Sequence, residues 1–184
     1  MAKALVFLAE GFEEIEAVTV VDVLRRADVQ VDTAALGHKR VLGAHGIAIE
    51  AEVLLDEVVA KGQGQQLYDA LILPGGMPGA RHLRDDARVK TLITQQHQSG
   101  RIVAAICAAP IALEAAGVLR GKAATAYPGY ALESAKYRED RVVIDGNIVT
   151  SRGPGTALEF ALTLVEQLVG GDKAAKLRSG MVVA

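Results

Sequence analysis

Short runs of consecutive apolar residues recur along this chain, and longer stretches of helical periodicity separate them. Residues 5–8, 70–73 and 102–106 are such runs, with no polar residue inside them. A strand without a polar face must be covered on both sides, which is typical of parallel sheets. Alternation of such strands with helices therefore predicts an α/β fold: a mostly parallel sheet with helices on both faces.

The same patterns place the remaining elements. A turn at Asp145-Gly146 predicts a hairpin between two short apolar runs. Thr156 with Glu159 is the pattern of a capping box that opens the last helix. The predicted strands cover residues 5–8, 29–35, 47–51, 70–73, 102–106, 142–144 and 148–150. The predicted helices cover residues 13–27, 86–98, 109–116 and 156–169, and residues 54–59 are predicted as a short helix or a turn.

Composition narrows the class of protein. A chain of 184 residues has the size of one domain, so we expect residues 1–184 to fold as a single unit. The net charge of -2, without a long run of either sign, disfavours nucleic acid and anionic membranes as partners. One cysteine excludes an internal disulfide, and four scattered histidines give no metal-binding pattern. No apolar stretch suits a membrane span or a signal peptide, so we expect a cytoplasmic protein.

Cys107 is the first candidate for chemistry, because ligands of parallel sheets bind beyond the carboxyl ends of the strands. It follows the strand predicted at 102–106, and a helix is predicted from Ala109. A strand, a sharp turn and a helix form the outline of a nucleophile elbow. The positive end of the helix dipole would lower the pKa of the thiol. The alternative is that Cys107 is a small buried apolar residue, as most free cysteines are.

A glycine turn follows the strand predicted at 70–73, in the sequence Pro74-Gly75-Gly76. Glycines there let backbone N–H groups approach an anion closely. The spacing fits neither a Walker loop nor a dinucleotide fingerprint. The turn is therefore either an anion-binding loop or an ordinary turn.

Glu16 lies on the apolar stripe of the first predicted helix. At about 100° per residue, Val20, Val23 and Ala27 fall within about 40° of it. Burial of a carboxylate is costly, so we expect the pKa of Glu16 to be raised and the group to hold or share a proton. Such a group could donate a hydrogen bond to a thiolate or move a substrate proton. The neighbouring acids 13 and 14 suit the first turn of a helix and need no further reason.

Four segments together resemble the ThiJ/PfpI superfamily, and within it the branch that contains the parkinsonism-associated protein. The segments are residues 10–16, 73–76, 105–110 and 150–156. The resemblance runs nearly end to end, from about residue 3 to residue 183. It implies a flavodoxin-like three-layer sandwich that forms a homodimer.

The resemblance also implies roles for residues. Cys107 would be the nucleophile and Glu16 the protonated carboxyl beside it, and the backbone N–H groups of Gly76 and Ala108 would form an oxyanion pocket. Members of this kind are described as cofactor-free and metal-free glyoxalases, which convert methylglyoxal to lactate, and as deglycases acting on early glycation adducts. The other residues implied for substrate binding are Gly75, Tyr127, His45 and Arg26.

Three positions qualify this resemblance. Tyr127 stands where close relatives carry a histidine before the proline, and a phenol with a pKa of about 10 is a poor base at neutral pH. His45 stands where an arginine lines the pocket of the family. Both changes bear on turnover and on anion affinity. Ala108 stands where the protease-like branch carries a histidine, which argues against a peptidase.

A second class of function needs the same residues. The chain could be an oxidation-sensing stress-response protein or a redox-regulated chaperone without useful turnover. Its switch would be oxidation of Cys107 to a sulfinic acid, held by Glu16 and the Gly76 amide. The sequence leaves the enzyme and the sensor open.

Overall fold

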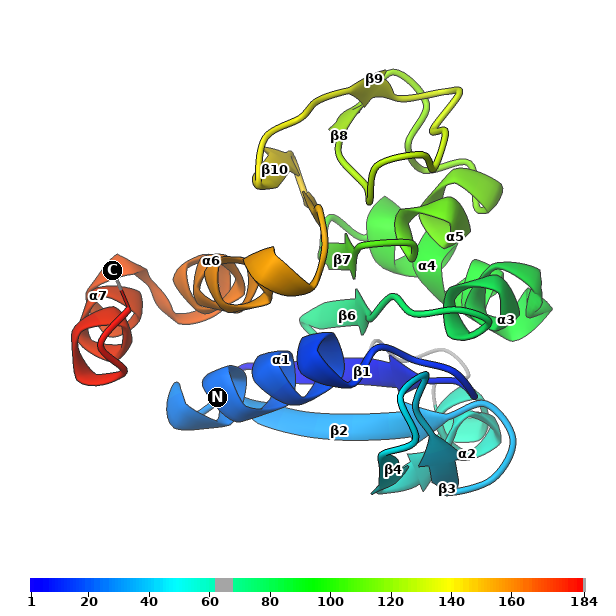
Figure 1. Cartoon of the computed structure of the whole chain (residues 1–184), viewed down its shortest axis with the longest axis horizontal. Helices are drawn as coiled ribbons and strands as arrows, with labels where there is room; N and C mark the ends of the chain where they lie inside the picture. Colours follow the sequence, from blue (N-terminus) through cyan, green and yellow to red (C-terminus); the bar gives the residue numbers. More distant parts are fainter. Residues whose placement is uncertain (62–67, 184) are drawn as a thin grey trace.

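The computed structural model describes residues 1–61 and 68–183. Its central sheet consists of β1 (Lys3–Leu8), β2 (Gln30–Ala35), β5 (Val53–Leu54), β6 (Ala70–Leu73), β7 (Ile102–Ile106), β10 (Val142–Asp145) and β11 (Ile148–Ser151). Their order across the sheet is β10-β11-β7-β6-β1-β2-β5 (Figure 1). All neighbouring pairs are parallel except β10 and β11. The expected α/β fold with a mostly parallel sheet is confirmed.

Helices cover both faces of this sheet. They are α1 (Glu14–Arg26), α2 (Leu55–Lys61), α3 (Gly79–Asp85), α4 (Ala87–Gln98), α5 (Pro110–Ala115), α6 (Ala157–Val169) and α7 (Gly171–Gly180). Helix α1 packs against β1, β2 and α6, whereas α4 packs against β6, β7, α3 and α5. Within the described residues, no helix is both long enough and apolar enough to cross a membrane.

The centre of the core explains the apolar runs of the sequence. Residues 4–8 of β1 are fully inaccessible to solvent, and so are residues 103–106 of β7. Both strands are therefore buried on both faces, as the absence of polar residues predicts. On α1 the stripe that contains Val20 and Val23 is buried as well.

Several elements were not predicted. The strand β3 (Arg40–Leu42) was not predicted; it pairs in a small hairpin with β4 (Ala48–Glu50), which matches the strand predicted at 47–51. The strands β8 (Ala123–Ala124) and β9 (Lys136–Tyr137), which pair with each other, were not predicted either. The three missed strands are only two or three residues long, too short for an apolar pattern, and α7 buries none of its residues. Helix α3 was not predicted either; it lies directly after the glycine turn.

The predicted capping box is wrong in its partners, although helix α6 is confirmed. The hydroxyl of Thr156 accepts a hydrogen bond from the Gly153 N–H at 3.1 Å and lies 2.7 Å from the Ser151 hydroxyl. Glu159 instead pairs with Arg141 at 2.6 Å. Thr156 therefore stabilises the turn before the helix rather than the first turn of the helix.

The order of the strands makes the connections after two neighbouring strands, β1 and β6, run in opposite directions across the sheet. From β1 the chain continues to β2 on one side, and it later enters β6 on the other side. The connections after β1 and β6 therefore separate, which leaves room for a ligand at the carboxyl edge of the sheet. Figure 1 shows β6 and β7 pointing the same way, with α3 following at the edge where β6 ends.

Candidate active site

Cys107 lies at a sharp turn immediately after β7. Its φ angle is 63°, a left-handed conformation that residues with a Cβ rarely adopt. Two hydrogen bonds hold it there: its N–H donates to the Ser151 carbonyl at 2.9 Å, and its carbonyl accepts from the Tyr127 N–H at 2.8 Å. The predicted nucleophile-elbow turn is confirmed, and the strain at Cys107 is maintained by the end of β11 and by the loop that carries Tyr127.

Gly75 joins this turn to helix α1. Its N–H donates to Glu16 Oε2 at 2.7 Å, and its carbonyl accepts from the Glu13 N–H at 2.9 Å. A Cβ at position 75 would lie 2.6 Å from the Cys107 Cβ and 2.8 Å from Glu16 Oε2. Only glycine fits, because the thiol-bearing residue and the carboxyl meet across this backbone.

Gly76 is equally constrained. Its φ angle is 84°, and an added Cβ would lie 2.3 Å from the Glu13 nitrogen. The backbone N–H groups of Gly76 and Ala108 form hydrogen bonds to the Cys107 sulfur, and these lower the pKa of the thiol. The residues predicted for an oxyanion pocket are therefore brought together around the sulfur.

Glu16 is fully buried, as its place on the apolar stripe predicts. Burial raises its pKa to about 7, against the lowering effects of the hydrogen bonds from Gly75 and Cys107. The charge of Glu13 adds to the increase. A carboxyl with such a pKa can hold or release a proton near neutral pH, which is what proton transfer requires.

While Glu16 is ionised, the pKa of the Cys107 thiol is raised rather than lowered. Burial is the main cause, and the negative charge of Glu16 is the second; together they raise the pKa of Cys107 to about 12. The expected lowering by the helix N-terminus alone is therefore wrong for that charge state. Because each negative charge opposes the other, the two groups titrate as a pair that keeps one proton in the neutral range.

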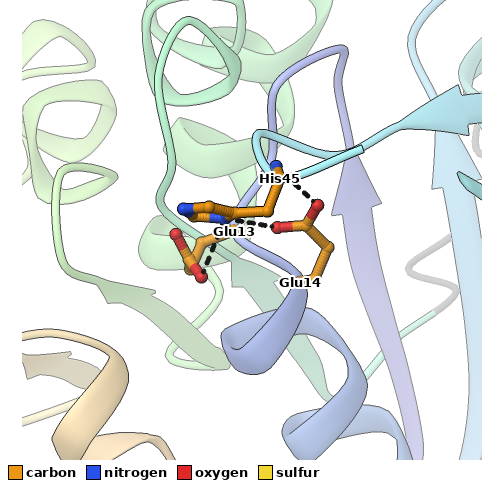
Figure 2. A group of neighbouring side chains, drawn as sticks. All are labelled: Glu13, Glu14 and His45. Atoms are coloured by element: carbon orange, nitrogen blue, oxygen red, sulfur yellow. Dashed lines mark hydrogen bonds and ion pairs between the residues drawn. The ribbon is translucent and has the colours of Figure 1, made fainter. Parts of the chain in front are cut away.

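His45 lies next to the N-terminus of α1 (Figure 2). We call His45 and Tyr127, two exposed candidate residues, the rim of the site. Its ring nitrogen Nδ1 is 2.9 Å from Glu14 Oε2 and 3.6 Å from Glu13 Oε1. The hydrogen bond with Glu14 and the charges of both acids raise the pKa of His45. The ring is mostly exposed and contacts these acids, and no contact joins it to Cys107 in the described part of the chain.

Glu13 and Glu14 are the residues that sequence reasoning undervalued. They are only 9% and 5% exposed, although first-turn acids are normally solvated. Burial opposes ionisation of Glu14, but hydrogen bonds from the His45 ring and from the backbone N–H groups of His45 and Ile47 lower its pKa overall. Glu14 thus ties loop 43–47 to α1, across a sequence separation that no local pattern reveals.

Glu13, Glu14 and His45 also place three ligand atoms within 4.8 Å of one another, as a metal site would. Both oxygens of Glu14 already accept hydrogen bonds from His45, and Oε1 also accepts one from Ile47. The cluster is therefore explained by its internal hydrogen bonds.

The two remaining candidates have different outcomes. Tyr127 reaches the site through its backbone N–H, and its ring lies against Gly153, where an added Cβ would be 3.1 Å from Cδ2. Arg26 does not reach the site, so the expectation that it binds substrate is wrong. It lies in the last turn of α1, about 15 Å along the axis from Glu16, and pairs with Asp22 at 2.7 Å.

Comparisons with known proteins agree with this geometry. Residues 2–167 match the model of the DJ-1/PfpI family. The Parkinson disease protein 7 homolog of Danio rerio is 41% identical, with 98% of this chain and 97% of that protein covered. The glutathione-independent glyoxalase DJR-1.2 of Caenorhabditis elegans is 37% identical, with 98% of this chain and 96% of that protein covered.

A solved structure shows the same fold. The crystal structure of Drosophila melanogaster DJ-1beta superposes with a TM-score of 0.93 at 39% identity, covering 100% of this chain and 98% of that one. The match includes the edge of the sheet where Cys107, Glu16 and the glycine turn meet. On the family match and on this similarity over nearly the full length, the chain belongs to the DJ-1/PfpI family.

Proposed function

We propose that this protein is a cofactor-independent glyoxalase that converts methylglyoxal to lactate with Cys107 as nucleophile and Glu16 as proton carrier. The observation that carries the proposal is the contact between a strained, sole cysteine and a buried carboxyl with a pKa near 7. Two backbone N–H groups complete the arrangement. A nucleophile, a proton carrier and an oxyanion pocket are what this isomerisation requires.

The first step is addition of the sulfur to the aldehyde carbon. The sulfur receives two backbone N–H donors. The Glu16 carboxylate receives one backbone donor, from Gly75, besides the hydrogen bond that it shares with Cys107. This difference favours the negative charge on Cys107 and the proton on Glu16. The thiolate forms a C–S bond, the carbonyl π electrons move to oxygen, and Glu16 gives its proton to that oxygen. The product is a neutral hemithioacetal and an ionised Glu16.

The second step moves a proton between carbons. The Glu16 carboxylate removes the proton from the carbon bound to sulfur, which leaves an enediolate. Glu16 returns a proton to the neighbouring carbon, while the proton on the first oxygen passes to the second. The result is a thioester of lactate, with no net oxidation or reduction. A pKa of about 7 suits a group that must both accept and donate within one cycle.

Hydrolysis of the thioester ends the cycle. Water adds to the thioester carbonyl, the C–S bond breaks, and lactate leaves as its anion. Cys107 returns as a thiolate, Glu16 regains one proton, and a second proton enters solvent. A deglycase reaction, in which early glycation adducts are hydrolysed, would begin with a similar attack by Cys107. We include this reaction in the proposal.

The test is lactate formation from methylglyoxal by the purified protein, in the presence of a chelator and with no added cofactor. Wild type should form lactate, and Cys107→Ala should form none, because the hemithioacetal cannot form. Circular dichroism checks that the variant is folded. Equal lactate formation by both proteins would refute the enzyme.

Oxidation sensing by the same cysteine is the second candidate. The observation that favours it is the set of donors around the sulfur, because Gly76, Ala108 and a protonated Glu16 would each bind a sulfinate oxygen. Mild peroxide should add two oxygens to the Cys107 peptide in mass spectra. If Glu16→Ala gives the same products at the same dose, Glu16 does not stabilise the sulfinate.

We also propose that the chain forms a homodimer through α1 and the neighbouring loop. Ile15, Val18, Leu42 and Ile47 are each about half exposed, and hydrogen bonds from Leu42 to Glu10 and from Ile47 to Glu14 bring these segments together. An apolar face of this kind on a folded chain indicates an interface. Sedimentation should give about twice the chain mass, and Val18→Glu should give monomers; a monomeric wild type would exclude the dimer.

A further inference from the structure

The exposed aromatic surface of this protein is confined to one segment. The chain has three phenylalanines, four tyrosines and no tryptophan. The phenylalanines are buried, as is Tyr68. Tyr127 is 46% exposed and Tyr137 is 40% exposed, and Tyr130 lies between them in the chain. In the described residues, every aromatic ring with substantial exposure therefore lies between positions 127 and 137.

A backbone hydrogen bond joins this segment to Cys107. The Tyr127 N–H donates to the carbonyl of Cys107 at 2.8 Å, and the Tyr130 N–H donates to the carbonyl of Tyr127 at 3.1 Å. The rings of Tyr127 and Tyr130 meet edge to face, with centroids 6.4 Å apart and planes at 72°. Gly153 leaves room for the Tyr127 ring, since an added Cβ would lie 3.1 Å from it. The backbone of the ring pair is thus held at Cys107 by a hydrogen bond, and about half of Tyr127 is open to solvent.

We propose that the ring pair Tyr127–Tyr130 binds the substituent of the substrate and makes 2-oxoaldehydes that carry an aromatic group good substrates. This inference rests on the proposed glyoxalase function. When the aldehyde carbon is bound to the sulfur, the substituent projects from the adjacent carbonyl carbon. Tyr127 is the exposed aromatic residue whose backbone is hydrogen-bonded to Cys107, so its ring is the group that we infer meets this substituent. An exposed tyrosine ring offers an apolar face to a planar group and cannot act as a base at neutral pH.

The size of the effect follows from aromatic pairing. Such pairs contribute an interaction that corresponds to about a two- to ten-fold change in rate. Phenylglyoxal and methylglyoxal have the same reacting carbons and differ in the substituent. The ratio of their kcat/KM values therefore measures the contact of the substituent, and any change in the Cys107 and Glu16 chemistry cancels.

The experiment measures this ratio for wild type, Tyr127→Leu and Tyr130→Leu, with Tyr137→Phe as a control that keeps its ring. The ratio of phenylglyoxal to methylglyoxal should fall about two- to ten-fold in Tyr127→Leu, less in Tyr130→Leu, and not at all in Tyr137→Phe. A ratio that is the same in wild type and Tyr127→Leu overturns the inference.

A second readout needs no turnover. Cys107 is the sole cysteine, so its alkylation is read directly by mass spectrometry. N-benzyl-iodoacetamide should react faster relative to iodoacetamide in wild type than in Tyr127→Leu. If neither oxoaldehyde is consumed, the proposed function fails and the alkylation ratio alone decides: a lower ratio in Tyr127→Leu supports the ring pair, and an equal ratio refutes it.

Discussion

The inner site and its rim differ in how tightly the fold constrains them. At the inner site Cys107, Glu16 and Gly75 are packed so closely that a single added Cβ at Gly75 would lie within 2.8 Å of both neighbours. At the rim, the side chain of His45 is 68% exposed, and Tyr127 is 46% exposed. The inner residues carry the motifs on which the resemblance rests, whereas His45 and Tyr127 are positions where the resemblance implies other residues.

The difference indicates that the inner site determines the rate of the reaction, whereas the rim determines the selectivity for substrates. A substitution in the inner site must disturb the nucleophile, because the contacts there leave no free volume. A substitution at the rim changes an exposed ring and leaves the pair of titrating groups in place. Inner variants should therefore alter the rate of the reaction by orders of magnitude, and rim variants should alter selectivity.

Apart from loss of Cys107 itself, the largest effect is expected for Glu16→Gln. Glutamine keeps the hydrogen-bonding shape but cannot carry a proton, so methylglyoxal turnover should fall about 10²–10⁴-fold. Alkylation of Cys107 by iodoacetamide serves as the control and should remain within the same order of magnitude. Full glyoxalase activity in this variant would mean that another group moves the proton.

The next effect is expected for Gly75→Ala. The added Cβ would press on the Cys107 Cβ and on Glu16 Oε2, at 2.6 and 2.8 Å. Overpacking should cost about 1–3 kcal/mol in the free energy of unfolding, and displacement of the nucleophile should lower turnover about 10²-fold. Gly37→Ala is the matched control, because an added Cβ there meets nothing within 4 Å. If the two variants behave alike in denaturant titrations and assays, close packing at Gly75 has no role.

Stability should depend on pH through Glu16. Its pKa is about 7 in the folded protein against a reference of 4.5, so the folded state binds more protons between these values. The free energy of unfolding should therefore decrease by about 3 kcal/mol as pH rises from 4.5 to 7. Urea titrations of wild type and Glu16→Gln at several pH values measure the difference. Parallel curves for the two proteins would show that Glu16 has an ordinary pKa.

The smallest effect is expected at the rim. Tyr127→His introduces the residue that the resemblance implies at this position. It should raise methylglyoxal turnover, but by less than the factor of about 10² that a general base contributes. Tyr127→Phe should cost much less than Glu16→Gln, since the phenol is a poor base. Steady-state rates measure both. A loss with Tyr127→Phe as large as with Glu16→Gln would place Tyr127 in the inner site.

The sequence predicts the inner site well because each residue there carries a local signal. Cys107 follows a strand without polar residues, Glu16 interrupts an apolar stripe, and Gly75 lies in the turn after another strand. The rim carries no such signal, because it is built by contacts between distant segments. Glu14 bonds to His45 across 31 positions, and no periodicity on α1 distinguishes it from an ordinary first-turn acid.

The errors have related causes. The resemblance alone implies Arg26 in the pocket, whereas Arg26 lies in the last turn of α1, outside the stripe that contains Glu16. The expected drop in the thiol pKa considered only the helix N-terminus. The structure adds burial and a second acid beside the sulfur, and both act in the other direction.

The central claim is that Cys107 carries the negative charge of the pair and Glu16 carries its proton. Ultraviolet absorbance of the thiolate against pH tests it directly, because wild type has no other cysteine. If Glu16 holds the proton, the thiolate should form with a midpoint below the unperturbed value of about 8.5. A midpoint above that value, toward the pKa of about 12 that burial beside an ionised Glu16 produces, would contradict the claim.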